Sequence, residues 1–341
     1  MVNRAKIKFK GAIMRKKNSS GTKSKSHLKL EVLDKNDYEK IHLATLEVLN
    51  KTGIFVDHKE ALGRLESAGC RVDKEKQIVF YPEKLVEDAI EETPSSFLAQ
   101  GRDPGKDCLL NGTNVFNCNF GEGFIINDIE SGERRPTTKQ DLSDFTLMCD
   151  AMPNIDLYLR GALSHDVPQE IFALHNAEAC LSNTGKHIFI CPVDGYQAHK
   201  IIEMVGAIVG GVNKIPEHRI LSFVNCPTSP LRLTSELCEN LMIGAEAGIC
   251  NLIESEVMPG ASGPVTLAGC IIVHNAELLA SLALSHVTKK GAPFIYGGGS
   301  ITIDMRTAAA CVGTPESSLL NGAIVQFARD YYNIPTLIGG G

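Results

Sequence analysis

Short apolar segments alternate with longer helical patterns through most of the chain, and this alternation limits the fold more than any other feature. The apolar segments, each a candidate β-strand, are 115–119, 157–163, 187–191, 220–225, 249–254, 293–297 and 335–338. Helical patterns lie near 137–152, 169–183, 197–210, 233–247, 275–289 and 315–332. Strands that are apolar throughout are typical of a parallel sheet buried on both faces. The pattern predicts an α/β fold: a (β/α)8 barrel would need one more βα step, whereas a doubly wound sheet would not.

The alternation divides the chain into three expected parts. Residues 1–30 contain ten Lys and Arg, no acid and no core-forming period, so we expect a basic disordered arm, or an upstream start placed before a true start such as Met14. Residues 31–110 are expected to form an N-terminal cap of helices with a short β-like piece at 78–81. Residues 111–341 would form the partial barrel, and an irregular β-hairpin region with strand candidates at 115–119 and 124–128 is expected near its start.

Composition and charge exclude several classes of protein. The chain has 341 residues, of which 43% are apolar and 22% charged, as in ordinary soluble proteins. No stretch reaches the roughly 18 unbroken apolar residues of a membrane helix, and the N-terminus lacks the apolar core of a secretion signal. Outside the basic arm, 24 basic residues stand against 40 acidic ones, so no nucleic-acid partner is expected. We expect a cytoplasmic protein without a membrane association.

Polar side chains follow most of the strand candidates. In a parallel barrel the active site lies at the carboxyl ends of the strands, and the residues found there are Glu122, His165, Asp166, Asp194, Asn225, Glu254, Glu256, Tyr296 and Asp304. For any single member, the simpler interpretation is a solvated loop residue. As a set they predict an acidic pocket suited to a cationic substrate, because carboxylates favour an ammonium group once water is excluded.

Metal and cofactor motifs are absent from the sequence. There is no phosphate-binding loop, no dinucleotide fingerprint, no G-x-S-x-G elbow and no H-E-x-x-H site. The pairs His165 with His175 and His274 with His286 could hold a metal, but isolated helical histidines are more often packed or surface residues. The eleven cysteines never show C-x-x-C spacing, so buried reduced thiols are favoured over disulfides or zinc. The fragment HNAE occurs at both 175–178 and 274–277, which fits a repeated βα unit.

A family resemblance rests on four ordered runs in the last third of the chain. They are SEVMPGASGPVTLAG (255–269), HNAELLASLAL (274–284), GAPFIYGGGSITIDMRTAAACVGTPES (291–317) and YYNIPTLIGGG (331–341). With them the chain resembles the trimethylamine methyltransferase family, MttB. The resemblance implies a TIM (β/α)8 barrel, incomplete at the C-terminus, with an N-terminal helical cap. It also implies transfer of a methyl group from trimethylamine to the Co(I) of a separate corrinoid protein, in methylamine metabolism and methanogenesis.

The resemblance further implies where the chemistry would lie. No cofactor is expected on this chain, since it lacks the Asp-x-His-x-x-Gly sequence of cobalamin-binding domains and the corrinoid would arrive on its partner protein. Members of the family that act on trimethylamine carry pyrrolysine, which would stand directly after Gly341. The sequence then stops at an amber codon, without the last βα unit, and the isolated chain would be inactive. Tyr296, Asp304, Glu254 and Glu256 are the substrate-binding candidates, without individual roles, and the full-length protein is expected to be a homo-oligomer.

Two other functions stay open. One is a methyltransferase of the same family that acts on glycine betaine or another quaternary amine. The other is a non-catalytic partial barrel that binds an amine or a partner protein. An ordinary residue in place of the expected amber codon would indicate the quaternary-amine enzyme, whereas titration of the chain with trimethylamine and glycine betaine tests the binding module.

Overall fold

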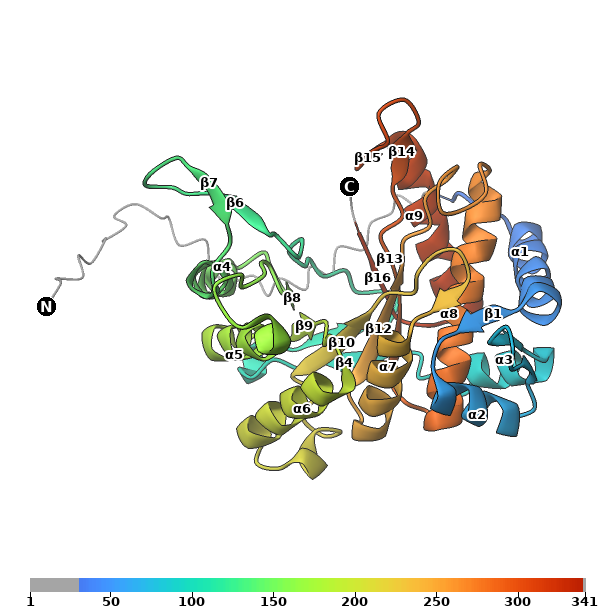
Figure 1. Cartoon of the computed structure of the whole chain (residues 1–341), viewed down its shortest axis with the longest axis horizontal. Helices are drawn as coiled ribbons and strands as arrows, with labels where there is room; N and C mark the ends of the chain where they lie inside the picture. Colours follow the sequence, from blue (N-terminus) through green and yellow to red (C-terminus); the bar gives the residue numbers. More distant parts are fainter. Residues whose placement is uncertain (1–30, 340–341) are drawn as a thin grey trace, which may run out of the picture.

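A curved parallel sheet forms the centre of the computed structural model, which describes residues 31–339 (Figure 1). Its strands, in spatial order, are β8 (Tyr158–Leu159), β9 (Ile188–Ile190), β10 (Leu221–Asn225), β12 (Cys250–Ser255), β13 (Phe294–Gly298) and β16 (Thr336–Ile338). Every neighbouring pair is parallel. The strand order follows the chain order without the reversal of a doubly wound sheet. The predicted α/β class is therefore confirmed as a curled, half-barrel sheet, whereas its assignment as a (β/α)8 barrel incomplete at the C-terminus stays a prediction.

The segment before β8 joins this sheet less regularly than predicted. Its ladder pairing with the β8 side, among the described residues, consists of two isolated parallel bridges, from Cys118 to Leu157 and from Gly123 to Ala162. The strand expected at 115–119 is therefore not a regular strand. The segment expected at 124–128 does form a strand, β6 (Ile125–Asn127), which pairs antiparallel with β7 (Arg134–Pro136).

Six helices follow the strands and cover the outer face of the sheet (Figure 1). They are α4 (Lys139–Ala151), α5 (Phe172–Asn183), α6 (Gly195–Val209), α7 (Ser235–Ala247), α8 (Leu267–Thr288) and α9 (Pro315–Phe327), the last extended by a π-helical turn, η5 (Ala328–Tyr332). Short 3-10 turns, η3 (Gln169–Ile171) and η4 (Val212–Lys214), precede α5 and follow α6. Side-chain caps begin five of the six helices, at Thr138, Asp194, Thr234, Thr266 and Thr314.

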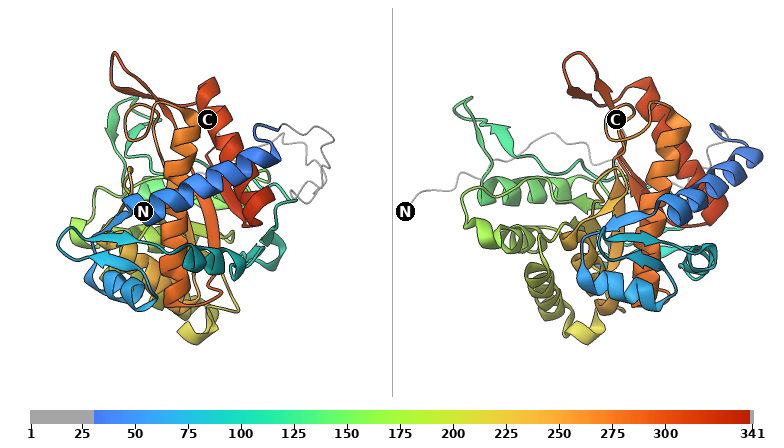
Figure 2. Two further views of the ribbon diagram at one scale, coloured as in Figure 1. Left: turned by 90° about the vertical axis from the view of Figure 1, so that its right-hand side faces the viewer. Right: turned by 45° about the vertical axis from the view of Figure 1, so that its right-hand side comes forward.

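The N-terminal part is mixed rather than purely helical. Its elements are α1 (Lys35–Glu47), η1 (Val48–Thr52), β1 (Ile54–Val56), α2 (Lys59–Ser67), β2 (Arg71–Asp73), β3 (Ile78–Phe80) and α3 (Glu83–Glu91). Its strands join β11 (Arg232–Leu233), from the loop after β10, in a four-stranded sheet of order β11-β1-β3-β2. Both views in Figure 2 show α1 lying across α8 and α9. The pairing of β1 with β11 therefore ties the N-terminal part to the barrel, and the boundary at residue 110 stays a prediction.

Two further hairpins complete the fold. The first joins β4 (Phe97–Ala99) to β5 (Cys108–Leu110) through the 3-10 turn η2 (Pro104–Lys106). Its apolar side chains form one hydrophobic cluster with sheet residues such as Phe189 and Leu252, so it fills the concave side of the sheet. The second, β14 (Thr302–Asp304) with β15 (Ala309–Cys311), projects near the top of Figure 1.

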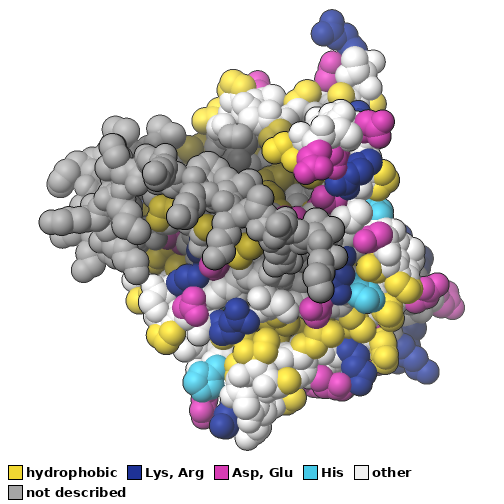
Figure 3. Space-filling view, turned by 90° about the vertical axis from the view of Figure 1, so that its left-hand side faces the viewer, with side chains coloured by type: hydrophobic (Ala, Val, Ile, Leu, Met, Phe, Trp, Pro, Cys, Tyr) yellow, Lys and Arg dark blue, Asp and Glu magenta, His cyan; other side chains and the backbone are white. Residues whose placement is uncertain are grey.

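The central helix α8 has an apolar composition because it is buried. Within residues 31–339 it is the one helix long and apolar enough to cross a membrane, but 72% of that window is buried inside the protein. It packs against α1, α3 and α7. On the face shown in Figure 3, basic and acidic side chains of the described residues are interspersed. All eleven cysteines are free and seven are buried, as predicted.

Candidate active site

The C-terminal end of strand β12 (Cys250–Ser255) brings two acidic side chains to the concave side of the sheet. Alternation along a strand places Cys250, Leu252 and Glu254 on one face, and the first two belong to the hydrophobic cluster that fills the concave side. Ser255 points the other way, toward α8, where its hydroxyl contacts Glu277. Glu256 follows directly after the strand. The predicted pair Glu254 and Glu256 therefore lies together at the carboxyl end of β12.

Burial and like charge perturb both acids. The pKa of Glu254 is raised to about 7, first by loss of hydration and then by the charges of Glu256 and Glu122. The pKa of Glu256 is also raised, by loss of hydration and by Glu122, although its side chain is more exposed to solvent. Glu254 is therefore a carboxyl group that gains and loses its proton near neutral pH.

Two glycines of β13 and its following turn make room for these acids. A Cβ atom at Gly299 would lie 3.2 Å from the Glu256 Oε1 atom, and one at Gly297 would lie 3.3 Å from Glu254 Cγ. A Cβ atom at Gly297 would also clash with Leu252, because the Leu252 Cδ1 atom would lie only 2.5 Å from it. The glycine run after the strand thus serves close packing around the acids, and it is not a nucleotide-binding loop.

A buried cation lies at the same end of the sheet. Arg160, just after β8, has a side chain only 4% exposed. Its Nη2 group donates to Glu122 and its Nη1 group donates to the carbonyl of Cys191 at 3.2 Å. Glu122 itself adopts φ of 67°, uncommon outside glycine, and its backbone N–H donates to the Arg160 carbonyl at 3.0 Å. Three carboxylates and one guanidinium leave the site negatively charged.

The structure corrects the prediction for Tyr296. Its ring is 1% exposed and belongs to the hydrophobic cluster between the sheet and helices α8 and α9. Its hydroxyl donates to Asn275 Oδ1 at 2.9 Å, and the Asn275 amide in turn contacts Tyr332 and Thr45. Tyr296 therefore points away from Glu254 and supports the packing of α1, α8 and α9.

Asp304 is also separated from the acidic pair. It ends β14 and accepts hydrogen bonds from the Arg306 backbone N–H at 2.9 Å and from the Thr307 hydroxyl at 3.0 Å. These donors lower its pKa. Such contacts close the tight turn of the β14–β15 hairpin, so the structure gives Asp304 a structural position and does not bring it to Glu254 and Glu256.

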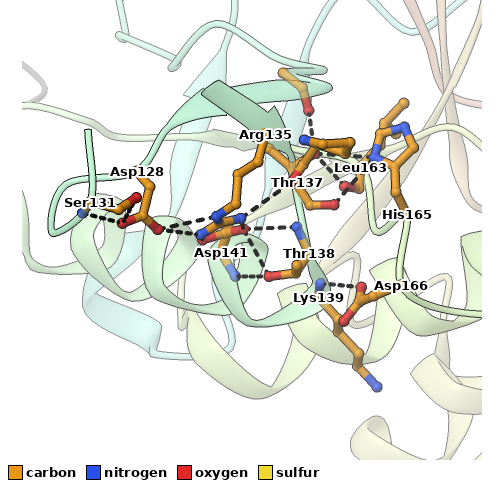
Figure 4. A network of polar contacts seen from close by, with 12 residues as sticks. Asp128, Ser131, Arg135, Thr137, Thr138, Lys139, Asp141, Leu163, His165 and Asp166 are labelled. Carbon is orange, nitrogen blue, oxygen red and sulfur yellow. Dashed lines mark hydrogen bonds and ion pairs between the residues drawn. The ribbon is translucent and has the colours of Figure 1, made fainter. Parts of the chain in front are cut away.

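The other polar residues after the strands hold loops and helix ends. Figure 4 shows the Asp166 carboxylate accepting from the Lys139 backbone N–H at 2.7 Å, and His165 against Thr137. Asp194 caps α6, and Asn225 donates to Asn251 at 3.2 Å. Of the nine polar residues predicted after the strands, the acids that lie close together are Glu122, Glu254 and Glu256.

Sequence reasoning missed Arg160 and Glu277 as parts of this region. Arg160 lies inside the candidate strand LYLRGAL, and a charge in an otherwise apolar strand is the signal that could have found it. Glu277 lies within the repeated HNAE fragment. Among residues 31–339 no cluster of three His, Cys, Asp or Glu side chains is arranged to hold a metal ion. Burial lowers the pKa of His274 to about 3, so that imidazole is neutral.

A separate groove lies away from these acids. It has a volume of about 780 Å³ and is lined by residues of α2, by Leu85 of α3 and by the C-terminal end of α8. Because α8 ends before β13 begins, this groove lies toward the amino ends of the strands. Its Arg64 is already paired with Glu60 at 2.6 Å and Glu246 at 2.7 Å. The groove is therefore not part of the acidic site.

Comparisons with known proteins identify the family. Residues 4–341 match the family model for trimethylamine methyltransferase (MTTB). The chain is 40% identical over 301 residues to trimethylamine methyltransferase MttB of Desulfitobacterium hafniense (strain DSM 10664 / DCB-2), covering 88% of this chain and 60% of that relative. The MttB of Methanosarcina thermophila is 32% identical over 326 residues, or 94% of this chain and 67% of the relative. The glycine betaine methyltransferase of D. hafniense (strain Y51) is 32% identical over 319 residues, covering 92% of this chain and 65% of that relative.

The structural comparison supports the same fold at lower sequence identity. The crystal structure of the Methanosarcina barkeri monomethylamine methyltransferase, MtmB, matches with a TM-score of 0.56 and 13% identity, covering 90% of this chain and 68% of that one. This likeness concerns the fold alone. The match of the family model over nearly the whole chain decides the assignment: the chain belongs to the trimethylamine methyltransferase family.

Proposed function

We propose that this chain binds a methylated amine, trimethylamine first of all, and presents its methyl group to the Co(I) of a separate corrinoid protein. The observation that carries the proposal is the pair Glu254 and Glu256 at the carboxyl end of β12, in a chain of this family. The chain spans 60% of the length of the D. hafniense MttB that it matches, and the activity is therefore proposed for the protein as a whole. Methylamine metabolism in the cytoplasm, by a homo-oligomer, is the proposed setting.

The charge of the site supports a cationic ligand. Trimethylamine is protonated at neutral pH and carries one positive charge. Ionised Glu254 and Glu256 attract that charge, and partial exclusion of water strengthens the attraction. Arg160 would repel the same ligand, but Glu122 pairs with it and offsets its charge.

Positioning is the main contribution that these residues can make to methyl transfer. A corrinoid on the partner protein would supply the nucleophile that takes the methyl group, and the amine would leave as dimethylamine. The carboxylates would hold the nitrogen in one place while the methyl group points away from the carboxyl ends of the strands, toward solvent. Fixing two reactants in line removes much of the entropy cost of a two-body reaction.

The proposal is tested by binding and by transfer. We expect calorimetric binding of trimethylamine and tetramethylammonium above pH 7, and weaker binding for Glu254→Gln and Glu256→Gln, by about tenfold or more, because each loses a charge. With a purified corrinoid protein in the Co(I) state, the change in cobalt absorbance follows transfer. Equal binding by the wild type and both variants would contradict the assignment of the site.

Glycine betaine is the second candidate substrate, and Arg160 is the observation that favours testing it. The carboxylate of betaine needs a cation, and Arg160 Nε is buried without a partner among the described residues. Because Glu122 already occupies the same guanidinium, we expect betaine to bind more weakly than tetramethylammonium. The reverse order in the same titration would favour a quaternary-amine methyltransferase. Because this chain spans 60% of the length of the D. hafniense MttB, only binding without methyl transfer by the whole protein would favour the non-catalytic binding module.

A further inference from the structure

A fully buried carboxylate of α8 contacts the strand that carries the acidic pair. Glu277 is 0% exposed. Its Oε2 atom accepts hydrogen bonds from the Ser255 hydroxyl at 2.6 Å and the Ser229 hydroxyl at 2.9 Å, and Oε1 accepts from the Leu231 backbone N–H at 2.8 Å. One side chain thus joins α8, the end of β12 and the loop after β10.

All three partners of Glu277 are donors. A carboxylate accepts without needing a donor of its own, so this set fits the ionised form, although burial alone raises the pKa of Glu277. The charge of Glu277 acts on Tyr296, on β13, whose ring contacts that of His274, three residues before Glu277 on α8. Removing the carboxylate would leave three donors without their acceptor, and that of Ser255 is fully buried, which is costly.

The contact with Ser255 links Glu277 to the site. Ser255 lies between Glu254 and Glu256, and its side chain points to the opposite face from Glu254. Its position in the sheet is fixed by pairing with Gly298. A short hydrogen bond that holds the Ser255 side chain against α8 therefore also fixes the backbone from which the two acids project.

We propose that Glu277 is a positioning residue for the amine site: through Ser255 it sets the direction of Glu254 and Glu256. The inference rests on the proposed function, because it concerns the same site. Glu277 does not reach the substrate. It acts from behind the sheet through Ser255, and the backbone N–H of Leu231 holds its other carboxylate oxygen in place.

The repeated HNAE fragment gives a comparison within the chain. In α5 the fragment places Asn176, also 0% exposed, against Ser164, whose hydroxyl donates to Asn176 Oδ1 at 2.6 Å. Asn176 is the second residue of its fragment and Glu277 is the fourth, so the positions differ, but each buried side chain accepts a hydrogen bond from a serine near the end of the preceding strand. Ser164 is not adjacent to Glu254 in the sheet, so Asn176 serves as a structural control.

The test compares four variants of the 341-residue chain with tetramethylammonium chloride as the probe. Ser255→Ala removes the link to β12, whereas Glu277→Gln weakens it by replacing the charged acceptor with a neutral amide. We expect each to weaken probe binding at pH 8 by about tenfold, the scale of one lost hydrogen bond to a charged group. Ser229→Ala removes a contact to the same Glu277 oxygen, and Asn176→Ala removes the contact between α5 and Ser164. We expect both controls to bind the probe as the wild type does, while urea unfolding reports the stability lost by each variant.

The pH profile separates positioning from general destabilisation. Glu254 faces Glu256, Glu122 and the thiols of Cys118, Cys191 and Cys226. Wild-type binding should rise as the pH passes about 7, where Glu254 ionises. In Ser255→Ala the Glu254 side chain is no longer held in place and gains hydration, so its pKa falls. The pH midpoint of probe binding should therefore move to lower pH.

The outcomes distinguish this inference from the proposed function. If the wild type binds no methylated ammonium, the function itself is contradicted. If the wild type binds but Ser255→Ala keeps its affinity and pH midpoint, the positioning role is overturned. Loss of binding in all four variants, in proportion to lost stability, would also overturn it, because Glu277 would then be only one of several structural contacts.

Discussion

At the scale of single residues, Glu254 couples the site to pH. In the unfolded chain a glutamate titrates near 4.3, whereas in the folded protein the pKa of Glu254 is about 7. The folded state therefore holds this proton more tightly, and the cost of ionising Glu254 appears as pH rises between these values and remains above 7. The site thus lowers the stability of the fold at the pH where it binds cations best.

Glu254→Gln removes that cost. We expect the variant to be more stable than the wild type at pH 8, by on the order of 2 kcal/mol, and the difference to shrink toward pH 5. Urea unfolding of both proteins across this range measures it. A variant that is less stable than the wild type at pH 8 would contradict the raised pKa, and Glu203→Gln, on the exposed side of α6, is the control that should show no such trend.

Tyr296 provides a second prediction at this scale. Tyr296→Phe leaves Asn275 Oδ1 without its donor in a buried position, so we expect a loss of about 1–2 kcal/mol of stability. Because the hydroxyl points toward α8, amine affinity should stay unchanged. If Tyr296→Phe weakened tetramethylammonium binding without changing stability, Tyr296 would have to be assigned to the amine-binding pocket instead. Tyr196→Phe, at a side chain 62% exposed, is the matched control.

At the scale of elements, Arg135 fastens the β6–β7 hairpin to α4. Its guanidinium contacts Asp128 at 2.8 Å and Asp141 at 2.6 Å (Figure 4). Both aspartates have lowered pKa values; for Asp128 it is about 2, first through the Ser131 N–H and then through Arg135. The contact of Arg135 with Asp128, within the hairpin, therefore persists above pH 4 and weakens as pH falls toward 2, while the contact with Asp141 on α4 is also kept at neutral pH.

We expect Arg135→Ala to release the hairpin locally. Amide hydrogen exchange of 125–136 should become faster at neutral pH, while exchange in β10 and β12 stays slow. Arg134→Ala, at the neighbouring exposed position, is the control and should leave the hairpin protected. Equal acceleration throughout the sheet would show that the hairpin is not a separate local unit.

Elements were easier to predict than the directions of their side chains. Apolar runs at 220–225 and 249–254 correspond to β10 and β12 within one residue, because strands buried on both faces are apolar throughout. The same uniformity hides which face each residue occupies, so the sequence does not show that Tyr296 points toward α8. It also does not show that Asp304 lies in a hairpin after β13, because no periodicity indicates that hairpin. Helix α8 begins eight residues before the predicted 275, since Thr266 caps it directly after the glycine- and proline-rich loop.

At the scale of the whole molecule, the N-terminal part and the sheet share one core. Leu65 of α2 and Leu279 of α8 belong to the same hydrophobic cluster. Leu65→Ala should therefore cost about 2–5 kcal/mol, and the helices around the sheet should unfold in the same transition. Circular dichroism and tyrosine absorbance would follow it, and two separated transitions would contradict a shared core. Leu43→Ala, at a side chain 54% exposed, should change stability by less than about 0.5 kcal/mol.

The contact between Thr45 and Asn275 has a consequence for how the protein is made. The two residues are 230 positions apart, and at roughly 5–20 residues per second a ribosome needs about 10–50 seconds to bridge that distance. Each strand of the sheet finds its neighbour soon after leaving the exit tunnel, whereas α1 must wait for α8. During that interval the apolar face of α1 is uncovered and can bind chaperones. We expect chaperones to bind most strongly to nascent chains that are stalled before residue 267.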